Sequence, residues 1–522
     1  GLGDVYKRQS WMSLMGRVSM DRFGEIQEER IAAGSIDVPK YDRYNKDFSE
    51  MNYDLIASFN KYFGADDIVS FDGNLGLNIR RTTLSSIFAA TNGGLVVPKV
   101  YSLANSANPV AAPTESAYKI ATNGYFGRAS FGYDNFLYLD LTGRYDISST
   151  LPADNNAYFY PSASLSLLFS ELLNIDGLSF GKLRFNYAEV GNDAPALSLL
   201  NTFDLGTAFG GLALASASNT EKNANLLPES TVSLEAGVEL RFAKDRLGLD
   251  VSVYKSNTFD QIIPVAVTGA TGSLFKYVNA GNIQNQGIEV ALNTTPVKSG
   301  DFTWNSNITW SKNQNEVIEL YGDQTNIQLT GVQGGVTINA AIGEPYGALK
   351  GTNFVYTADG EKVVYPHWNG GMRWRKTSTP EVIGNVNPDW KGGWSNAFTY
   401  KNVTASFLID VQMGGDFFSL DTWYGYATGI YDFTAGVNEK GGQVRDAVDA
   451  DGGLLIGGVT QASDADGNLL FDADGFAVKD ADNDIYGYAQ DVYSSFGYVY
   501  APNAYHVHDA SYVKLREAAL TY

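Results

Sequence analysis

The sequence contains no cysteine and only 3 histidines among its 522 residues. The lack of cysteine excludes a disulfide scaffold, a Cys-ligated metal site and a cysteine nucleophile. Basic residues are also scarce, because 37 Lys and Arg stand against 58 Asp and Glu, a net charge of −21 at pH 7. Such a surface repels phosphates, so we expect no nucleic-acid partner. The 44% of hydrophobic residues can bury a core, which argues against a disordered chain.

Long apolar runs are missing too. No run approaches the roughly 18 residues that a transmembrane helix needs. The residues around Asp4, Lys7 and Arg8 lack the apolar centre of a signal peptide. Residues 1–9 resemble a translated sequencing-adapter tail, so we expect them to be non-native and expect residues 10–522 to carry the fold.

The main signal is an alternation of apolar and polar residues over about ten positions, followed by a turn. Leu137, Leu139 and Leu141 share one face of such a segment, and Asp140 and Arg144 share the other. A period of two residues predicts a β-strand with one apolar face. The pattern predicts about fourteen strands, near residues 11–22, 51–62, 67–80, 118–132, 136–148, 162–170, 178–190, 229–242, 246–257, 286–295, 302–312, 391–400, 403–413 and 512–522.

Charged residues stand in the middle of these strands, at Asp140, Arg144, Glu235, Glu239 and Arg241. They would face bulk water in a soluble sandwich and line a wet lumen in a large membrane barrel. The polar faces alone leave both architectures open.

The connections between strands favour the barrel. Short connections follow Tyr62, Gly132, Ser170, Phe242, Thr295 and Tyr400, and long ones follow Arg80, Ser148, Val190, Asn257, Lys312 and Met413. An outer-membrane barrel has short periplasmic turns and long extracellular loops. Tyr and Trp at the strand ends suit the aromatic girdles of a membrane protein, although cross-strand pairing in any sheet also explains them. We therefore predict an all-β, antiparallel transmembrane barrel.

Several motifs then point to a family. Residues 279–289 read Asn-Ala-Gly-Asn-Ile-Gln-Asn-Gln-Gly-Ile-Glu, and residues 384–390 read Gly-Asn-Val-Asn-Pro-Asp-Trp. Gly-Gly-Asp at 414–416 and Ala-Ser-Tyr-Val-Lys-Leu-Arg at 510–516 follow. Over residues 50–522 their order resembles the SusC/RagA branch of TonB-dependent outer-membrane transporters. We expect the motif residues to shape bulges, turns and strand starts at the barrel rim; they are Asn279, Gly281, Asn285, Gly287, Glu289, Gly384, Asn385, Pro388, Gly414, Gly415 and Asp416.

The resemblance implies a 22-stranded barrel closed by an N-terminal plug. The chain would supply about fourteen of those strands, with the signal peptide, the plug and the last strands outside it. The resemblance also implies import of oligosaccharides or peptides through the outer membrane of a Gram-negative bacterium, surrounded by membrane lipid. A SusD-like surface lipoprotein would act as a lid, and the TonB complex would act through the missing N-terminal part.

Two other functions remain open. A TonB-dependent receptor for a siderophore or cobalamin would work without a lid. A surface β-protein such as an adhesin or lectin would transport nothing. An enzyme is not expected, because only His367, His506 and His508 are available and none lies near a nucleophile motif. His506 and His508 are either a solvated pair or a weak metal site.

Residues 431–500 are strongly acidic, with 13 Asp and Glu against 3 Lys and Arg. Oxygen ligands at every second position suit calcium, the one cofactor that the sequence suggests. The EF-hand template fails, however, and Asp-Gly pairs also form solvated turns. The calcium candidates are Asp464, Asp466, Asn468, Asp480, Asp482 and Asp484.

Aromatic residues gather in the two longest predicted loops. Flat rings there could stack on sugars or anchor peptides, or they could pack the loops and a lid interface. The candidates for substrate contact are Trp368, Trp374, Trp423, Tyr424 and Tyr426.

Overall fold

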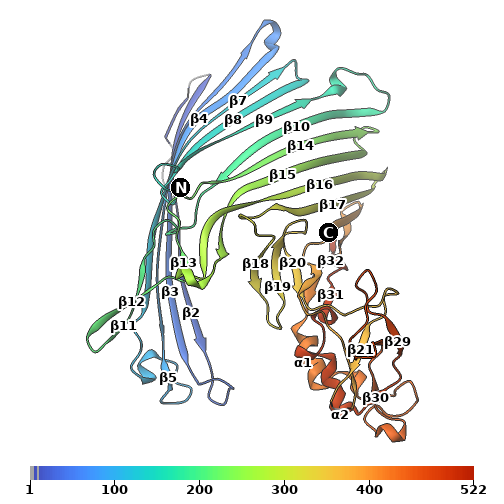
Figure 1. Cartoon of the computed structure of the whole chain (residues 1–522). Coiled ribbons are helices and arrows are strands. Elements are labelled where there is room, and N and C mark those ends of the chain that lie inside the picture. Colours follow the sequence, from blue (N-terminus) through green and yellow to red (C-terminus); the bar gives the residue numbers. More distant parts are fainter. Residues whose placement is uncertain (1–4, 9–10, 369) are drawn as a thin grey trace. The chain divides into compact units, whose positions relative to one another are not determined.

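Long antiparallel strands dominate the computed structural model, which describes residues 5–8, 11–368 and 370–522 (Figure 1). The chain forms two compact units. Unit 1 runs to Leu292 and includes Tyr321–Asp323, and unit 2 comprises Asn293–Leu320 and Gln324–Tyr522. None of the helices in the described ranges is both long and apolar enough to cross a membrane.

Unit 1 is an up-and-down sheet in which strands that follow one another in the chain are also neighbours in the sheet. Antiparallel registers join these neighbours along most of its width. In sheet order the strands are β1 (Val5–Arg8), β2 (Met12–Arg30), β3 (Tyr41–Phe63), β4 (Val69–Ala90), β7 (Thr114–Tyr133), β8 (Leu137–Ser148), β9 (Ala157–Leu167), β10 (Leu178–Asn192), β14 (Glu229–Phe242), β15 (Leu247–Ala266) and β16 (Phe275–Ser299). The residues of β16 that follow Leu292 belong to unit 2.

The connections at the two ends of these strands differ in structure. At one end lie β5, β6 and the β11–β12 hairpin, which Figure 1 shows below the long strands of unit 1. Two consecutive connections depart from the predicted alternation of short and long. The connection 168–177, which was predicted to be short, is longer than the connection 149–156, which was predicted to be long. A short 3-10 helix, η3 (Phe169–Glu171), occupies the longer one. The small elements of unit 1 are η1 (Ala65–Asp67), β5 (Asn92–Leu95), η2 (Leu103–Asn105), β6 (Ser106–Asn108), η3, β11 (Phe203–Phe209), β12 (Leu212–Ala217), β13 (Thr220–Glu221) and η4 (Gly269–Thr271).

Each predicted strand overlaps a strand of the sheet, but several strands extend farther at the end of the long connections. β3 begins at Tyr41 rather than at 51, β4 ends at Ala90 rather than at 80, and β16 begins at Phe275 rather than at 286. The extensions pair through the backbone, as Asp42 does with Ala90. Backbone pairing needs no apolar face, so the alternating pattern marks only part of each strand.

The predicted adapter tail is partly described. Val5–Arg8 forms β1 and pairs antiparallel with β2, while residues 1–4 and 9 lie outside the described residues. Strand pairing does not decide whether a segment is native, so the non-native origin of residues 1–9 stays a prediction.

One face of the unit 1 sheet carries large apolar side chains that remain exposed. Leu75, Phe159, Phe185 and Leu234 are each more than half exposed. Phe185 lies opposite Leu165 on one neighbouring strand and opposite Ala236 on the other, so the apolar face continues across the sheet. A water-facing sheet would not leave such a continuous apolar face uncovered.

Unit 2 contains four long strands and a separate folded region. Its long strands are β17 (Phe302–Glu319), β24 (Trp390–Tyr400), β25 (Val403–Met413) and β32 (Tyr512–Thr521), paired antiparallel in that order. The remaining residues of unit 2 between these strands, 324–389 and 414–511, are here called the loop domain.

The loop domain forms small sheets and short helices. β18 (Asn326–Gly331), β19 (Thr337–Ala341), β20 (Ala348–Gly351) and β23 (Glu381–Asn385) make one sheet. A second sheet combines both loops in the order β22 (Met372–Trp374), β21 (Val363–Pro366), β28 (Val459–Gln461) and β29 (Lys479–Asp482). The other elements are β26 (Asp416–Phe418), α1 (Leu420–Thr428), η5 (Asp432–Thr434), η6 (Val448–Ala450), β27 (Leu454–Leu455), β30 (Tyr486–Gly487), α2 (Ala489–Val492), η7 (Tyr493–Phe496), η8 (Tyr498–Tyr500), η9 (Asn503–His506) and β31 (Val507–Asp509).

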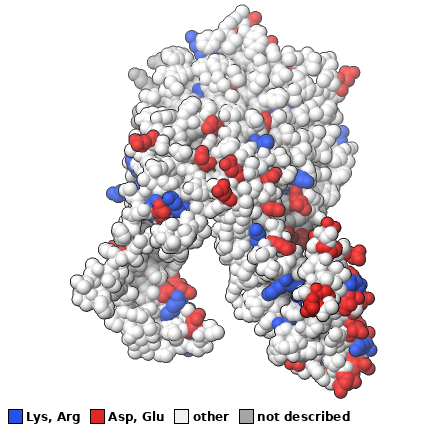
Figure 2. Space-filling view, viewed as in Figure 1, with Lys and Arg blue, Asp and Glu red and all other residues white. Residues whose placement is uncertain are grey.

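The loop domain has a hydrophobic core of its own. Val364, Met372 and Trp374 from the first loop pack with Ile456 and Val492 from the second. Its surface is acidic, and Figure 2 shows Asp and Glu side chains crowding its visible face. The two segments predicted as separate loops are therefore one folded region.

Candidate functional site

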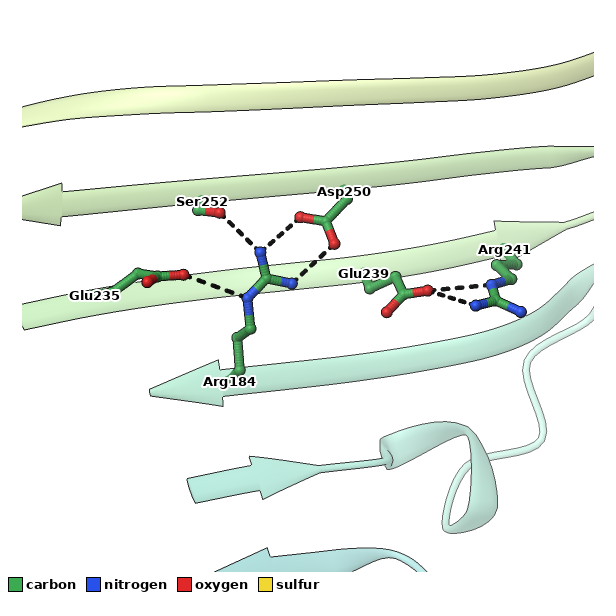
Figure 3. A network of polar contacts seen from close by, with 6 residues as sticks. All are labelled: Arg184, Glu235, Glu239, Arg241, Asp250 and Ser252. Carbon is green, nitrogen blue, oxygen red and sulfur yellow. Dashed lines mark hydrogen bonds and ion pairs between the residues drawn. The ribbon is translucent and has the colours of Figure 1, made fainter. Parts of the chain in front are cut away.

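Ion pairs link neighbouring strands on the polar face of unit 1. The Arg184 guanidinium of β10 donates two hydrogen bonds to the Asp250 carboxylate of β15, at 2.9 and 2.7 Å. It also donates to the Ser252 hydroxyl at 2.7 Å and lies 3.5 Å from Glu235 of β14 (Figure 3). Arg184 thus spans three strands with a two-pronged contact that suits a carboxylate.

Glycine makes this arrangement possible. Gly237 of β14 lies opposite Arg184 in the sheet register. A Cβ atom on Gly237 would lie 2.5 Å from Arg184 Nε. The missing side chain lets the guanidinium lie across β14 and reach Asp250 on the next strand.

The other mid-strand charges predicted from the sequence are also paired. Arg241 donates to Glu239 at 2.7 Å, and Arg128 donates to Asp140 at 2.7 Å. Arg144 donates to both oxygens of Asp146, which also accepts a hydrogen bond from Tyr160. The Arg128–Asp140 pair joins β7 to β8, whereas the other two ion pairs lie within one strand each. Paired charges on a polar face suit the wall of a water-filled lumen.

The motif at 279–289 lies inside a strand, which corrects the prediction that it forms a turn or strand start. β16 already begins at Phe275, so Asn285, Gly287 and Glu289 continue an extended strand. Gly281 has a φ of 81° and provides the expected irregularity. Asn279 contacts two other segments, because its side-chain amide donates to the carbonyls of Leu227 and Asp260.

The later motifs meet in space. Residues 384–389, 414–416 and 509–511, here called the motif junction, lie where β24, β25 and β32 join the loop domain. The Asn385 amide donates to the Asp416 carboxylate at 2.9 Å, and the Gly414 amide donates to Ser511 Oγ at 2.7 Å. The Asp389 amide donates to the Met413 carbonyl at 2.9 Å. The family motifs thus form one hydrogen-bonded connection between strands and loops.

Close approach explains the glycines of the motif junction. Gly414 and Gly415 have φ values of 72° and 82°, in the left-handed region. A Cβ on Gly384 would lie 2.9 Å from the Asp416 carboxylate, and one on Gly414 would lie 2.5 Å from the Asp389 carboxylate. Larger residues would separate the segments that the junction holds together.

A polar pocket of about 330 Å³ adjoins the motif junction. Asn315, Asn385, Asn387 and Pro388 are among its lining residues. The Asn387 side chain donates to the Tyr346 carbonyl at 2.9 Å. Amide groups of this kind can hydrogen-bond neutral polar ligands, and Lys312 and Asp389 add one charge of each sign to the lining.

The aromatic candidates for substrate contact divide into two groups. Trp368 is 90% exposed and Tyr424 is 41% exposed, so both are accessible. Trp374 and Trp423 are only 6% and 3% exposed, and Tyr426 packs against the core of the loop domain. The Trp374 indole donates to the Gly457 carbonyl at 3.0 Å. Burial corrects the prediction for Trp374 and Trp423, which stabilise the loop domain and offer no surface to a substrate.

The two late histidines meet through one hydroxyl. Thr422 Oγ1 of α1 lies 3.1 Å from His506 Nδ1 and 3.3 Å from His508 Nε2. His506 is fully buried. Burial, together with the nearby His508, lowers the pKa of His506 to about 4. His506 is therefore packed inside the loop domain, whereas His508 is half-buried, and the i, i+2 spacing alone did not reveal this difference.

The acidic candidates for calcium lie in turns. Asp464 accepts hydrogen bonds from the amides of Asp466 and Asn468, at 2.9 and 2.8 Å. Asp480 accepts one from the Thr460 hydroxyl, and Asp482 pairs with Lys479. Within the described ranges, no three His, Cys, Asp or Glu side chains are grouped so that they could hold a metal ion. Calcium binding at these residues, Asp484 included, therefore stays a prediction.

A run of basic residues in and beside β21 and β22 was not singled out from the sequence. Lys362, Arg373, Arg375 and Lys376 fall within fifteen residues that contain no Asp or Glu. In so acidic a chain, this local reversal of charge was the available signal.

Comparison with known proteins supports the fold and the family. Residues 30–400 match the family described as TonB dependent receptor-like, beta-barrel. TonB-dependent receptor P26 of Formosa agariphila is 27% identical over 398 residues, which cover 69% of this chain and 40% of that receptor. TonB-dependent receptor SusC of Bacteroides thetaiotaomicron is 30% identical over 211 residues, covering 38% of this chain and 21% of SusC.

A solved structure also has this fold. The structure of the RagAB peptide transporter superposes with a TM-score of 0.71 at 16% identity, covering 99% of this chain and 54% of that chain. The chain therefore matches 40% of the length of receptor P26 and 54% of the length of the RagAB chain, or about half of each.

Proposed function

Because the chain belongs to the TonB dependent receptor-like, beta-barrel family, we propose that it forms the wall and external loops of a SusC-type importer in the outer membrane of a Gram-negative bacterium. The imported substrates would be oligosaccharides or peptides. The chain carries no covalent chemistry in this proposal, and it acts by enclosing a path through the membrane.

The observation that carries the proposal is the division of the unit 1 sheet into two faces. Exposed Leu75, Phe185 and Leu234 lie on one face. Arg184 and Asp250 pair on the other. A barrel wall must present apolar side chains to lipid and polar side chains to its lumen. Cross-strand ion pairs let charges line that lumen without leaving an isolated charge next to the hydrocarbon.

The partners follow from the same proposal. A SusD-like surface lipoprotein would close over the loop domain, and the TonB complex would act on a plug supplied by another part of the protein. The motif junction would give such a lid a stable surface to close on, because it attaches the folded loop domain firmly to three barrel strands. RagAB, whose fold the chain shares, is a peptide transporter, so peptides stand beside oligosaccharides as candidate substrates.

A deletion experiment tests the function. In the bacterium that carries the gene, we expect deletion to abolish growth on some of a panel of oligosaccharides and peptides offered as sole carbon source. Loss of TonB should abolish growth on the same substrates, and the wild-type gene should restore growth in the deletion strain. Unchanged growth on the whole panel would contradict the proposal.

Two measurements separate the alternatives. We expect the protein in the outer-membrane fraction, with a gel mobility that changes on heating as in a closed barrel. Recovery in the soluble fraction would favour the surface β-protein. We also expect a lipoprotein to copurify in detergent, and growth defects limited to iron or cobalamin supply, without such a partner, would favour the chelate receptor.

A further inference from the structure

The apolar face of the unit 1 sheet is hollowed by a cavity of about 550 Å³, here called the wall groove. Its lining comes from the five adjacent strands β8, β9, β10, β14 and β15. Cavities of ~300–1,000 Å³ are large enough to hold small organic ligands. The groove therefore has the size of a binding site, although it lies on the outside of the wall.

The strand register explains why the face is hollow at this point. One row across β9, β10 and β14 carries Leu165, Phe185 and Ala236, and the next row carries Ala163, Tyr187 and Leu234. Each row thus places one alanine among large side chains. Phe185 and Leu234 are 54% and 57% exposed, so they rise above the short alanines beside them. The depression follows from this arrangement of small and large residues.

The groove opens on the face opposite to the ion pairs. Phe185 follows Arg184 directly in β10, and successive side chains of a strand point to opposite faces. Exposed Leu234 likewise precedes Glu235, which lies 3.5 Å from Arg184 (Figure 3). The groove therefore belongs to the face that the proposed function turns toward lipid.

One cation borders the groove. Lys255 of β15 lies opposite Leu234 in the register, lines the groove and is exposed. Among the ion pairs of the described residues, none involves Lys255. The carboxylate of Glu189, on the same face two strands away, accepts a hydrogen bond from the Ser230 hydroxyl at 3.1 Å. Lys255 thus adds a positive charge without a counter-charge to an apolar surface.

Lys255 also marks one boundary of the apolar band. The side chains of β15 that share its face are Leu247, Leu249, Val251 and Val253 before it and Asn257 after it. A tilted strand crosses the hydrocarbon of a membrane in about 9–11 residues, which matches the length of Leu247–Lys255. The β14–β15 turn lies at the end of the short connections, so Lys255 lies toward the long ones. A lysine at this height can extend its ammonium group to the membrane surface.

A lipid with a negative head group matches both parts of this surface. An acyl chain in the groove restores the dispersion contacts that an unfilled depression would lack. A lysine ammonium binds phosphate as a point charge, and this interaction is strong at the edge of the hydrocarbon, where little water screens it. A neutral lipid would fill the groove equally well but would leave Lys255 without a counter-charge.

We propose that the wall groove holds an acyl chain of a phosphorylated lipid and that Lys255 binds the phosphate of that lipid. The long connections are external in the proposed importer, so the lipid belongs to the outer leaflet of the membrane. The inference rests on the proposed function, because only a chain embedded in the outer membrane meets such a lipid.

The test uses the full-length protein, purified in detergent and freed of bound lipid. The probe is dipalmitoylphosphatidate, and dipalmitoylglycerol is the matched lipid that has the same chains and no phosphate. Native mass spectrometry should show about tenfold tighter binding of the phosphatidate. Lys255→Gln should abolish this preference, and Ala236→Leu, which fills the groove, should weaken binding of both lipids. Equal affinity of the wild type for the two lipids, or an unchanged preference in Lys255→Gln, would overturn the proposal.

Lys61→Gln is the matched control, because Lys61 lies on the same apolar face at the opposite end of the strands. It stands four residues after Ala57, which lies opposite Leu75, and it precedes the short connection that follows Phe63. The variant should bind phosphatidate as the wild type does. An equal loss in Lys61→Gln and Lys255→Gln would show that any lysine of the wall attracts the lipid, and the groove would then have no special role.

The same proteins separate the lipid site from the import function. Outer-membrane localisation, heat-dependent gel mobility and TonB-dependent growth should persist in Lys255→Gln. If the wild type has these properties and shows no preference for phosphatidate, the lipid site fails and the importer stands. If the wild type is recovered in the soluble fraction, the proposed function itself is wrong and the lipid site falls with it.

Discussion

The Asp416 carboxylate accepts a hydrogen bond of 2.9 Å from the backbone amide of Asn385, which lies 31 residues earlier in the chain. The contact joins β23 to β26 at the motif junction. It also explains why the two motifs that contain these residues occur in the same chain, since each supplies half of one connection.

Replacing Asp416 by alanine should loosen the loop domain. The variant leaves the Asn385 amide without its acceptor, a loss of about 1–3 kcal/mol for a half-buried group. We expect faster limited proteolysis within residues 414–511, with the barrel strands still resistant. Asp359→Asn, in an exposed turn of the same domain, is the control and should behave as wild type. Equal resistance of both variants to proteolysis would show that the Asn385–Asp416 hydrogen bond does not hold the motif junction together.

Gly237→Ala should disturb the polar face of unit 1. The new Cβ would lie 2.5 Å from Arg184 Nε, so the guanidinium must withdraw from Asp250. Overpacking of this kind destabilises by about 1–3 kcal/mol. Thermal unfolding in detergent measures the effect. Gly16→Ala, in a strand where a Cβ meets no atom within 4 Å, should leave the unfolding temperature nearly unchanged. A similar shift in both variants would contradict the close approach at Gly237.

Acid should destabilise the loop domain through His506. Burial lowers its pKa from the usual 6.5 to about 4, so the unfolded chain binds a proton at a higher pH than the folded one. The stabilisation is complete above about pH 6.5 and is lost as pH falls towards 4, by up to about 3 kcal/mol. Proteolysis rates across this range should rise in the wild type. The rise in proteolysis rate should be smaller in His506→Gln, and in His367→Gln it should be as large as in the wild type. An equal rise in all three proteins would exclude His506 as its cause.

Removal of calcium should have little effect on residues 464–484. Asp464 already accepts hydrogen bonds from two backbone amides and from the Asn468 side chain, and these contacts form a stable turn without a metal. We expect the same cleavage pattern with calcium and with a chelator. Protection by calcium that is lost in Asp464→Ala would instead support a metal site there.

The strands could be predicted because their signal is local. Alternation within residues 136–148 and 229–242 places β8 and β14 almost at their observed limits. The extended ends of β3, β4 and β16 could not be predicted in this way, since backbone pairing beyond the apolar band leaves no pattern in the side chains.

The candidate site was predictable only in part. Motif spacing singled out Asn385 and Asp416, and amphipathic alternation singled out the charged face that holds Glu235 and Arg241. The substrate-contact prediction was wrong for Trp374 and Trp423, because exposure in a long loop cannot be inferred when the loop has a core. The exposed Trp368 and Tyr424 stay predictions.

The sequence by itself determined the class of this protein, since strand period, face polarity and ordered motifs are properties of short segments. Only the tertiary structure decided that two loops share one core, that Gly237 admits Arg184 to its partner, and that Ala163 and Lys255 line one groove. Such contacts join residues far apart in the chain, and they depend on how the chain closes on itself rather than on any local pattern.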